Sequence, residues 1–228
     1  MKVKAVMFDL DGTLIEFKFR VNELKKELIK KLNDSNVMIE KSFQEESIQN
    51  IYEEAQRIMK LTDSKEKFEE ITSNMKEIIE KYEIEGMRQS AIKKDVLNTF
   101  NWLKKKRIKL ALVTNNGRKS AEYAVNRFEL TKYFEVITTR DEVSKWKPYP
   151  EPIQKTINQL GIKTIESIFV GDSKMDIWAA KSADVKIASI PTGIHSKQQL
   201  EEEKPDYLIY SLLEIITIVN NVNEKKYK

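Results

Sequence analysis

Five short runs of apolar residues recur along the chain, and each ends in a polar or glycine-containing turn. They cover residues 3–8, 108–113, 166–170, 185–190 and 207–210. Unbroken apolar runs of this length are typical of strands that are buried on both faces of a parallel sheet. We therefore expect a parallel sheet that is covered on both sides.

Between these runs, apolar residues return at intervals of three or four, which predicts amphipathic helices. The predicted helices cover 89–106, 118–128, 151–160, 173–182 and 211–220. Strands that alternate with helices favour an α/β fold, a doubly wound parallel sheet of the Rossmann-like kind.

Residues 16–85 depart from this alternation, because they contain three helical periodicities and no strand-like run. Spacings of three and four predict three helices that pack on one another. The repeating positions are Leu24, Leu28 and Leu32; then Ile51, Ala55, Ile58 and Met59; then Phe68, Ile71, Met75, Ile78 and Tyr82.

The simplest organisation is a helical domain inserted after the first strand. We expect an α/β core domain formed by residues 1–15 and 86–228, and a helical domain formed by residues 16–85. The chain would cross between the two near 15–18 and 84–89. Gly86 would give the second crossing the backbone freedom of a hinge.

Composition narrows the class of protein. The 228 residues carry 40 basic and 36 acidic side chains, a near balance that does not favour a nucleic-acid partner. No apolar run approaches the ~20 residues of a membrane span, and the first eight residues are too short for a signal peptide. The absence of cysteine excludes disulfides and thiolate chemistry. We expect a cytoplasmic protein without a membrane partner, either a monomer or a homodimer.

Acidic and hydroxyl side chains follow three of the predicted strands. Asp9 and Asp11 come after the first, Thr114 after the second, and Asp172 and Asp176 after the third. In an open α/β sheet, ligands bind outside the carboxyl ends of the strands. One aspartate in a turn is ordinary, whereas several at one sheet edge indicate a binding site.

Carboxylates that meet at one edge need a cation between them. Two unit charges 4 Å apart repel by about 1 kcal/mol in water and about 4 kcal/mol at an effective dielectric constant of 20. The ligands available are oxygens, and the lone His195 cannot build a zinc site. An all-oxygen cluster predicts Mg²⁺ as the cofactor.

Four segments carry a family resemblance. Residues 8–14 read FDLDGTL, 113–116 read VTNN, 147–150 read KPYP, and 171–176 read GDSKMD. In this order and at strand ends, they resemble the four signatures of the haloacid dehalogenase-like hydrolase superfamily. The inserted helices are similar to the first kind of cap domain, found in its phosphoglycolate phosphatase and β-phosphoglucomutase group.

The resemblance implies a set of catalytic residues. Asp9 would be the nucleophile and would form an aspartyl-phosphate. Asp11 would act first as general acid and then as general base. Thr114 would bind the phosphoryl group, and Lys147 would neutralise its charge. Lys147 is preferred to Lys145 because it directly precedes a proline, as in the family's pattern.

The resemblance also implies a metal site and a substrate site. Mg²⁺ would be held by Asp9, by the backbone carbonyl of Asp11 and by Asp172, while Asp176 would bind it through water or orient the lysine. Candidate substrate-binding residues follow the first two signatures: Gly12, Thr13, Asn115, Lys18 and Arg20. Lys18 and Arg20 could contact an anionic substrate, or they could be hinge residues whose charges face solvent. The sequence is equally compatible with both.

The resemblance favours phosphoester chemistry, because dehalogenases of this kind lack the second aspartate, which this chain has as Asp11. We therefore expect a phosphatase that acts on a small phosphorylated substrate. One alternative is a sugar-phosphate mutase of the β-phosphoglucomutase type, although residues 15–20 lack the histidine of those mutases. A catalytically inactive binding protein with the same fold is the other. Phosphoglycolate, a sugar phosphate, a nucleotide and pyrophosphate are not distinguished.

Overall fold

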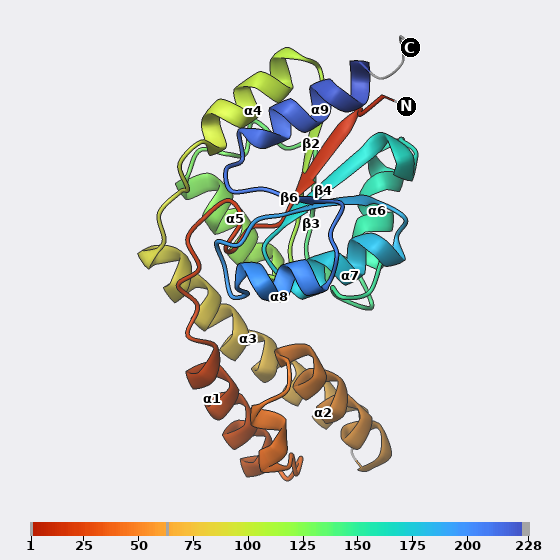
Figure 1. Ribbon diagram of the computed structural model, residues 1–228. Coiled ribbons are helices and arrows are strands. Elements are labelled where there is room, and N and C mark those ends of the chain that lie inside the picture. Colours follow the sequence, from red (N-terminus) through yellow and green to blue (C-terminus); the bar gives the residue numbers. More distant parts are fainter. Residues whose placement is uncertain (1, 63, 225–228) are drawn as a thin grey trace. The chain divides into compact units, whose positions relative to one another are not determined.

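A computed structural model of the protein describes residues 2–62 and 64–224. Within these residues, six strands form one parallel sheet in the order β3-β2-β1-β4-β5-β6 (Figure 1). The strands are β1 Ala5–Phe8, β2 Lys109–Val113, β3 Val136–Thr138, β4 Ser167–Gly171, β5 Lys186–Ser189 and β6 Tyr207–Leu208. The predicted α/β class and parallel sheet are confirmed.

Six helices connect these strands or follow the last one. They are α4 Val96–Lys105, α5 Arg118–Arg127, α6 Glu151–Leu160, α7 Lys174–Ser182, α8 Lys197–Glu202 and α9 Glu214–Glu224. Short 3₁₀ turns cover Arg140–Glu142 and Thr164–Glu166.

Alternate residues of β1 point into opposite layers of the core, as the twofold period of a strand requires. Ala5 and Met7 join a buried cluster with apolar side chains of α6 and α7. Phe8 points to the other face, where its ring lies 5.0 Å from that of Phe100 on α4. Both faces of the sheet are therefore covered by helices.

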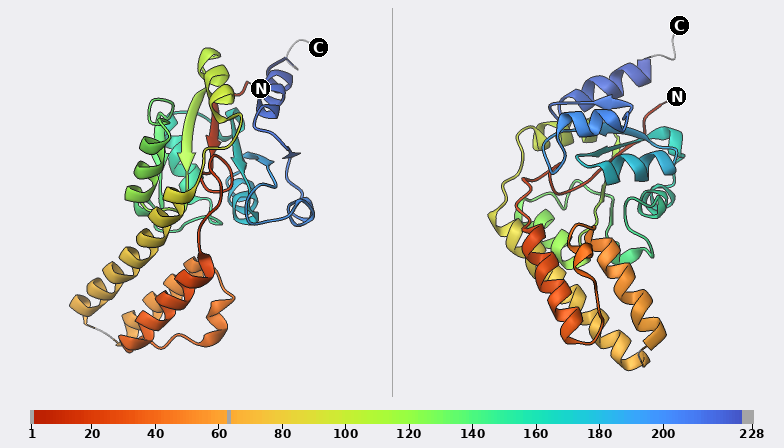
Figure 2. Two further views of the ribbon diagram at one scale, coloured as in Figure 1. Left: turned by 90° about the vertical axis from the view of Figure 1, so that its left-hand side faces the viewer. Right: turned by 60° about the horizontal axis from the view of Figure 1, so that its bottom comes forward.

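The chain divides into two compact units, one formed by Met1–Phe17 and Ser90–Lys228 and the other by Lys18–Gln89. The second unit contains α1 Val21–Asp34, α2 Ile48–Thr62 and α3 Lys65–Gln89, with a 3₁₀ turn at Lys41–Gln44. Within it, α1 and α3 lie side by side (Figure 2). Most of the predicted apolar positions are buried, but Ile79 is buried where Ile78 was expected.

The structure corrects the predicted hinge at Gly86. Gly86 lies inside α3, which continues to Gln89. A glycine inside a helix costs about 1 kcal/mol relative to alanine, which does not suffice to end a packed helix. A Cβ atom at Gly86 would lie 3.3 Å from both the Lys18 carbonyl oxygen and the Phe19 Cα. Glycine therefore permits close packing here, and the prediction of a flexible hinge at this residue is wrong.

Two further predictions about elements were inaccurate. The helix expected from residue 89 begins only at Val96, because residues 90–93 pair instead with 14–16. Strand β3 was not predicted, since it has three residues and carries too little pattern to be detected. No helix in the described part of the chain combines the length and apolar character that crossing a membrane requires. Residues 225–228, assigned to the core domain above, lie outside the described residues.

Candidate active site

The carboxyl ends of β1 and β4 lie next to each other and bring two aspartates together. The two strands pair in parallel, with Phe8 opposite Val170. The N–H of Asp9 extends this pairing by donating to the Val170 carbonyl at 2.9 Å. Asp172 follows two residues after Val170, so Asp9 and Asp172 lie at the same edge of the sheet. Both are buried.

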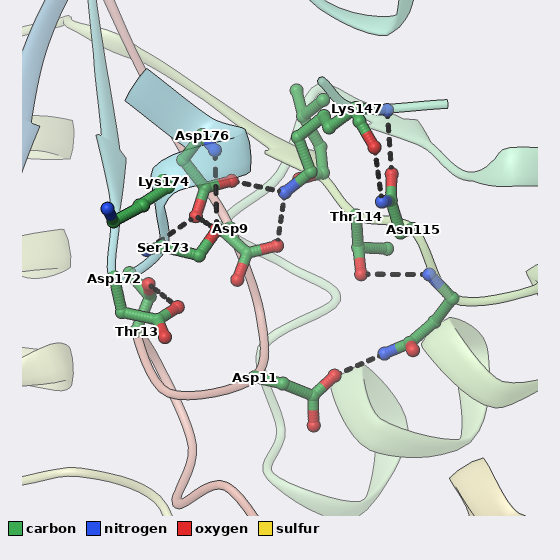
Figure 3. A network of polar contacts seen from close by, with 12 residues as sticks. Asp9, Asp11, Thr13, Thr114, Asn115, Lys147, Asp172, Ser173, Lys174 and Asp176 are labelled. Atoms are coloured by element: carbon green, nitrogen blue, oxygen red, sulfur yellow. Dashed lines mark hydrogen bonds and ion pairs between the residues drawn. The ribbon is translucent and has the colours of Figure 1, made fainter. Parts of the chain in front are cut away.

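Lys147 is the cation of this site. Its Nζ lies 2.6 Å from Asp9 Oδ1 and 2.6 Å from Asp176 Oδ1 (Figure 3). It also lies 3.2 Å from the Val113 carbonyl oxygen. These partners use all three donors of the ammonium group. Burial alone would lower the pKa of Lys147, but Asp176 and Asp9 together raise it above its ordinary value. The lysine therefore stays charged inside the protein.

The choice of Lys147 over Lys145 agrees with this geometry. Lys145 is exposed, and its ammonium lies 4.6 Å from the centre of the Tyr149 ring. The backbone of Lys147 is held by Asn115, whose Oδ1 accepts from the Lys147 N–H at 2.9 Å and whose Nδ2 donates to its carbonyl at 2.8 Å. The side chain of Asn115, expected to bind substrate, thus positions the lysine.

Three buried carboxylates, those of Asp9, Asp172 and Asp176, lie near the ammonium group of Lys147. Burial raises the pKa of Asp9 to about 6, although Lys147 opposes this shift. Burial raises the pKa of Asp172 well above its usual value, and the charges of Asp9 and Asp176 add to the effect. When all are ionised, these three carboxylates and Lys147 together carry two negative charges. The site therefore favours a divalent cation.

The carboxylates also meet a geometric condition for a metal site. Asp9, Asp172 and Asp176 each offer one oxygen, and these oxygens lie within 4.8 Å of one another. Buried carboxylate oxygens without sulfur or imidazole suit Mg²⁺. The residues present therefore fit the expected cofactor.

Asp176 is oriented by its own helix. It lies in the first turn of α7, and its Oδ2 accepts from the N–H of Ser173 at 3.0 Å and from its hydroxyl at 2.6 Å. This pair forms a capping box, an arrangement in which both residues satisfy free N–H groups of the helix end. The other carboxylate oxygen of Asp176, Oδ1, accepts from Lys147 Nζ at 2.6 Å, so Asp176 links the start of α7 to the lysine.

Asp172 is fitted tightly against the loop that follows β1. Thr13 Oγ1 donates to Asp172 Oδ1 at 3.2 Å. Gly12 has a φ of +78°, and a Cβ atom there would lie 2.5 Å from Asp172 Oδ2. Both the backbone conformation and the close approach therefore require glycine. Gly12 and Thr13 shape the loop around the Asp172 carboxylate.

Asp11 takes part in a separate contact with the loop after β2. The Nδ2 of Asn116 donates a hydrogen bond to Asp11 Oδ2 (Figure 3). The backbone N–H of Asn116 donates to the Oγ1 of Thr114 at 3.2 Å, so both residues belong to one buried turn. Sequence reasoning assigned no role to Asn116. Its place in the VTNN segment was the available signal, since the neighbouring Thr114 was already a candidate.

Lys18 and Arg20 belong to the inserted unit, Lys18–Gln89. Arg20 Nη2 lies 2.5 Å from Glu85 Oε2, and the guanidinium lies 5.4 Å from the centre of the Tyr82 ring. Arg20 thus links the start of α1 to α3. The Lys18 side chain is exposed. Their assignment to substrate binding stays a prediction.

Comparison with known proteins defines the family. Residues 6–190 match the haloacid dehalogenase-like hydrolase family. Pyrophosphatase PpaX of Bacillus cereus is 29% identical over 235 residues, which span 98% of this chain and 99% of that protein. A protein of Caldanaerobacter subterraneus subsp. tengcongensis, which has the same name in provisional form, is 31% identical over 233 residues and the full length of both chains.

Solved structures show the same fold. The structure described as a predicted phosphoglycolate phosphatase from Haemophilus somnus 129PT has a TM-score of 0.67 and 22% identity, covering 96% of this chain and 98% of that one. A Thermotoga maritima protein, provisionally described as a β-phosphoglucomutase, has a TM-score of 0.61 and 25% identity, covering 97% and 100%.

At the carboxyl edge of the parallel sheet, the site combines three buried aspartates with the buried Lys147. The chain belongs to the haloacid dehalogenase-like hydrolase family, and it is a phosphatase of that family.

Proposed function

We propose that the protein is a Mg²⁺-dependent phosphatase that hydrolyses a small phosphorylated compound through an aspartyl-phosphate on Asp9. The observation that carries the proposal is the buried Lys147, which binds both Asp9 and Asp176 while Asp172 lies beside them. Such a lysine favours the ionised form of Asp9, the form that can attack phosphorus.

In the first half of the reaction, a carboxylate oxygen of Asp9 forms a bond to phosphorus. The bond between phosphorus and the leaving oxygen breaks, and Asp11 gives that oxygen a proton. Thr114 lies in the same turn as Asn116, whose amide binds Asp11. This places the Thr114 hydroxyl on the same side of the site as Asp11, where we propose that it binds a phosphoryl oxygen. Lys147 offsets the charge that the phosphoryl group adds to Asp9.

In the second half, water attacks the phosphorus of the aspartyl-phosphate, and Asp11 accepts a proton from that water. The bond between phosphorus and Asp9 breaks, which releases phosphate and restores the carboxylate. Mg²⁺, held by Asp9 and Asp172 beside Asp176, would supply positive charge to the phosphoryl oxygens. General acid–base catalysis of this kind contributes about 10²–10⁴ in rate.

Pyrophosphate and phosphoglycolate are the first substrates to test, because relatives and structural neighbours are named for activity on them. Residues 15–20 contain no histidine, which supports hydrolysis over the mutase reaction. The helical unit at Lys18–Gln89 is proposed as the cap that selects the leaving group.

The test is phosphate release from a panel of substrates. It would include pyrophosphate, phosphoglycolate, a sugar phosphate, a nucleotide and p-nitrophenyl phosphate, each with Mg²⁺ and with EDTA. We expect release that needs Mg²⁺ and that falls below detection in Asp9→Asn. Asp184→Asn, a change at an exposed aspartate with φ of +55°, is the matched control.

Three results would contradict the proposal. Undiminished turnover in Asp9→Asn would exclude the aspartyl-phosphate, and full turnover in EDTA would exclude the metal. If no compound in the panel released phosphate, the protein would not be a phosphatase of these substrates. An isomerisation assay primed with a sugar bisphosphate would then distinguish a mutase from an inactive protein.

A further inference from the structure

Lys93 lies next to the loop that carries Asp9 and Asp11, although it belongs to none of the four signatures. The chain returns to the core unit at residues 90–93 and pairs there with residues 14–16. The N–H of Lys93 donates to the Leu14 carbonyl at 2.9 Å, and the N–H of Glu16 donates to the Ala91 carbonyl at 2.9 Å. Ile15 and Ile92 form an antiparallel bridge. This short ladder fixes the backbone from which the Lys93 side chain extends.

The ammonium group of Lys93 connects two loops of the site. It donates to the carbonyl of Gly12, in the loop after β1, and to the carbonyl of Thr192, in the loop after β5, at 2.8 Å. The hydroxyl of Thr192 donates to the same Gly12 carbonyl at 2.7 Å. The Gly12 carbonyl therefore accepts from both side chains.

The two connected loops enclose the carboxylate of Asp172. A Cβ atom at Gly193 would lie 1.6 Å from Asp172 Oδ2, and one at Gly12 would lie 2.5 Å from it. The N–H of Ile194 donates to Asp172 Oδ2 at 3.3 Å. The position of this carboxylate thus depends on how closely the two loops approach each other.

Partial burial of the Lys93 ammonium group costs free energy unless hydrogen-bond acceptors compensate for it. Its side chain is half-buried, and burial lowers its pKa to about 8, while the charges of Asp172, Glu16 and Asp9 oppose that shift. A buried ammonium needs hydrogen-bond acceptors, which the two carbonyls supply. An apolar side chain of the same length would leave both carbonyls without this donor.

We propose that Lys93 is a positioning residue of the active site, which joins the loop after β1 to the loop after β5 and thereby fixes Asp172 and the nucleophile loop. It acts through Gly12 and Thr192. Its effect on turnover rests on the proposed function, whereas its effect on the two loops does not. Small displacements of catalytic groups reduce rates steeply.

The test compares Lys93→Met with Lys94→Met, because Lys94 is the exposed neighbour of the same type. We expect kcat of Lys93→Met to fall about tenfold with KM changed less than about twofold. The Mg²⁺ concentration for half-maximal rate should rise, and Lys93→Arg should restore part of kcat. Lys94→Met should match the wild type in each quantity.

A second variant and a second measurement distinguish the positioning role of Lys93 from an effect on overall stability. Thr192→Val should lower kcat in the same direction, and the double variant should lose less than the product of the two effects, since both side chains bind one carbonyl. Hydrogen exchange in peptides covering 9–14 and 190–195 should increase in Lys93→Met and not in Lys94→Met.

Several outcomes would overturn the inference. These are equal kcat in Lys93→Met and Lys94→Met, a loss in Lys93→Met confined to KM, or unchanged exchange in both loops. A wild type without phosphatase activity would refute the proposed function only, because the exchange comparison would still decide the role of Lys93.

Discussion

Asn116 illustrates how a residue outside the predicted site can control one inside it. Its amide donates to Asp11, the proposed general acid and base, and its backbone N–H donates to Thr114. This hydrogen bond fixes the orientation of the Asp11 carboxyl group. Asn116 is buried, so this orientation is protected from water.

We predict that Asn116→Ala lowers kcat by about tenfold to a hundredfold, because it releases Asp11 from its position for general acid catalysis. The loss should be larger for phosphoglycolate than for p-nitrophenyl phosphate, whose leaving group needs less protonation. Asn158→Ala, at an exposed position of α6, is the control. Equal losses for both substrates would show that Asn116 does not act through proton transfer.

At the scale of elements, a hydrogen bond joins two helices of the inserted unit. The hydroxyl of Tyr82, on α3, donates to Glu27 Oε2, on α1, at 2.7 Å. This bond lowers the pKa of Glu27, and it raises the pKa of Tyr82 to about 12. Lys81 lies 3.2 Å from the same carboxylate. The pair therefore supports the packing of α1 on α3.

The Glu27 shift gives a pH dependence of stability. Since the folded pKa of Glu27 lies below its ordinary 4.5, its stabilising effect is present above that value and is lost as pH falls through the folded pKa. We predict that Tyr82→Phe lowers the free energy of unfolding by about 1 kcal/mol at neutral pH. The difference from wild type should shrink below about pH 4.

Denaturant unfolding at several pH values would measure this difference. Tyr123→Phe, at a half-buried tyrosine of α5, is the control and should show no such pH dependence. A difference between Tyr82→Phe and wild type that persists unchanged to pH 3 would exclude the ionised Glu27 as the cause.

At the scale of the whole molecule, the acidic cluster opposes folding when no cation is bound. Burial raises the pKa of both Asp9 and Asp172, so their ionised forms are less stable in the folded protein than in water. The contribution of each group to stability is greatest below its ordinary pKa and is lost as pH rises through the folded value. A metal that binds only the folded protein would restore stability by mass action.

We predict that millimolar Mg²⁺ raises the melting temperature of the wild type at neutral pH. Metal-free Asp172→Asn should melt above the metal-free wild type, because it removes one buried charge, and Mg²⁺ should raise its melting temperature much less. Differential scanning calorimetry with Mg²⁺ or EDTA measures both effects, with Asp184→Asn as the control. An equal response to Mg²⁺ in wild type and Asp172→Asn would place the metal elsewhere.

The sequence by itself determined the α/β class, most of the buried strands and the placement of Asp9 and Asp172 at one edge of the sheet. These features follow from local patterns, since an apolar run forms a buried strand and the residue after it lies at the sheet edge. The same local reasoning failed where the pattern was short or ambiguous. β3 has three residues and forms because β2 offers it hydrogen bonds, and Gly86 stays helical because α3 packs closely on Lys18 and Phe19.

Only the tertiary structure decided what the polar side chains of the site contact. Asn115 holds Lys147 across 32 residues, Lys93 reaches Thr192 across 99, and Asn116 reaches Asp11 across 105. No periodicity along the chain predicts such contacts. Each contact depends on the strand order, which decides which strand ends lie side by side. The physical reason is that a strand pattern fixes which face a side chain takes, whereas its partner is fixed by the packing of distant segments.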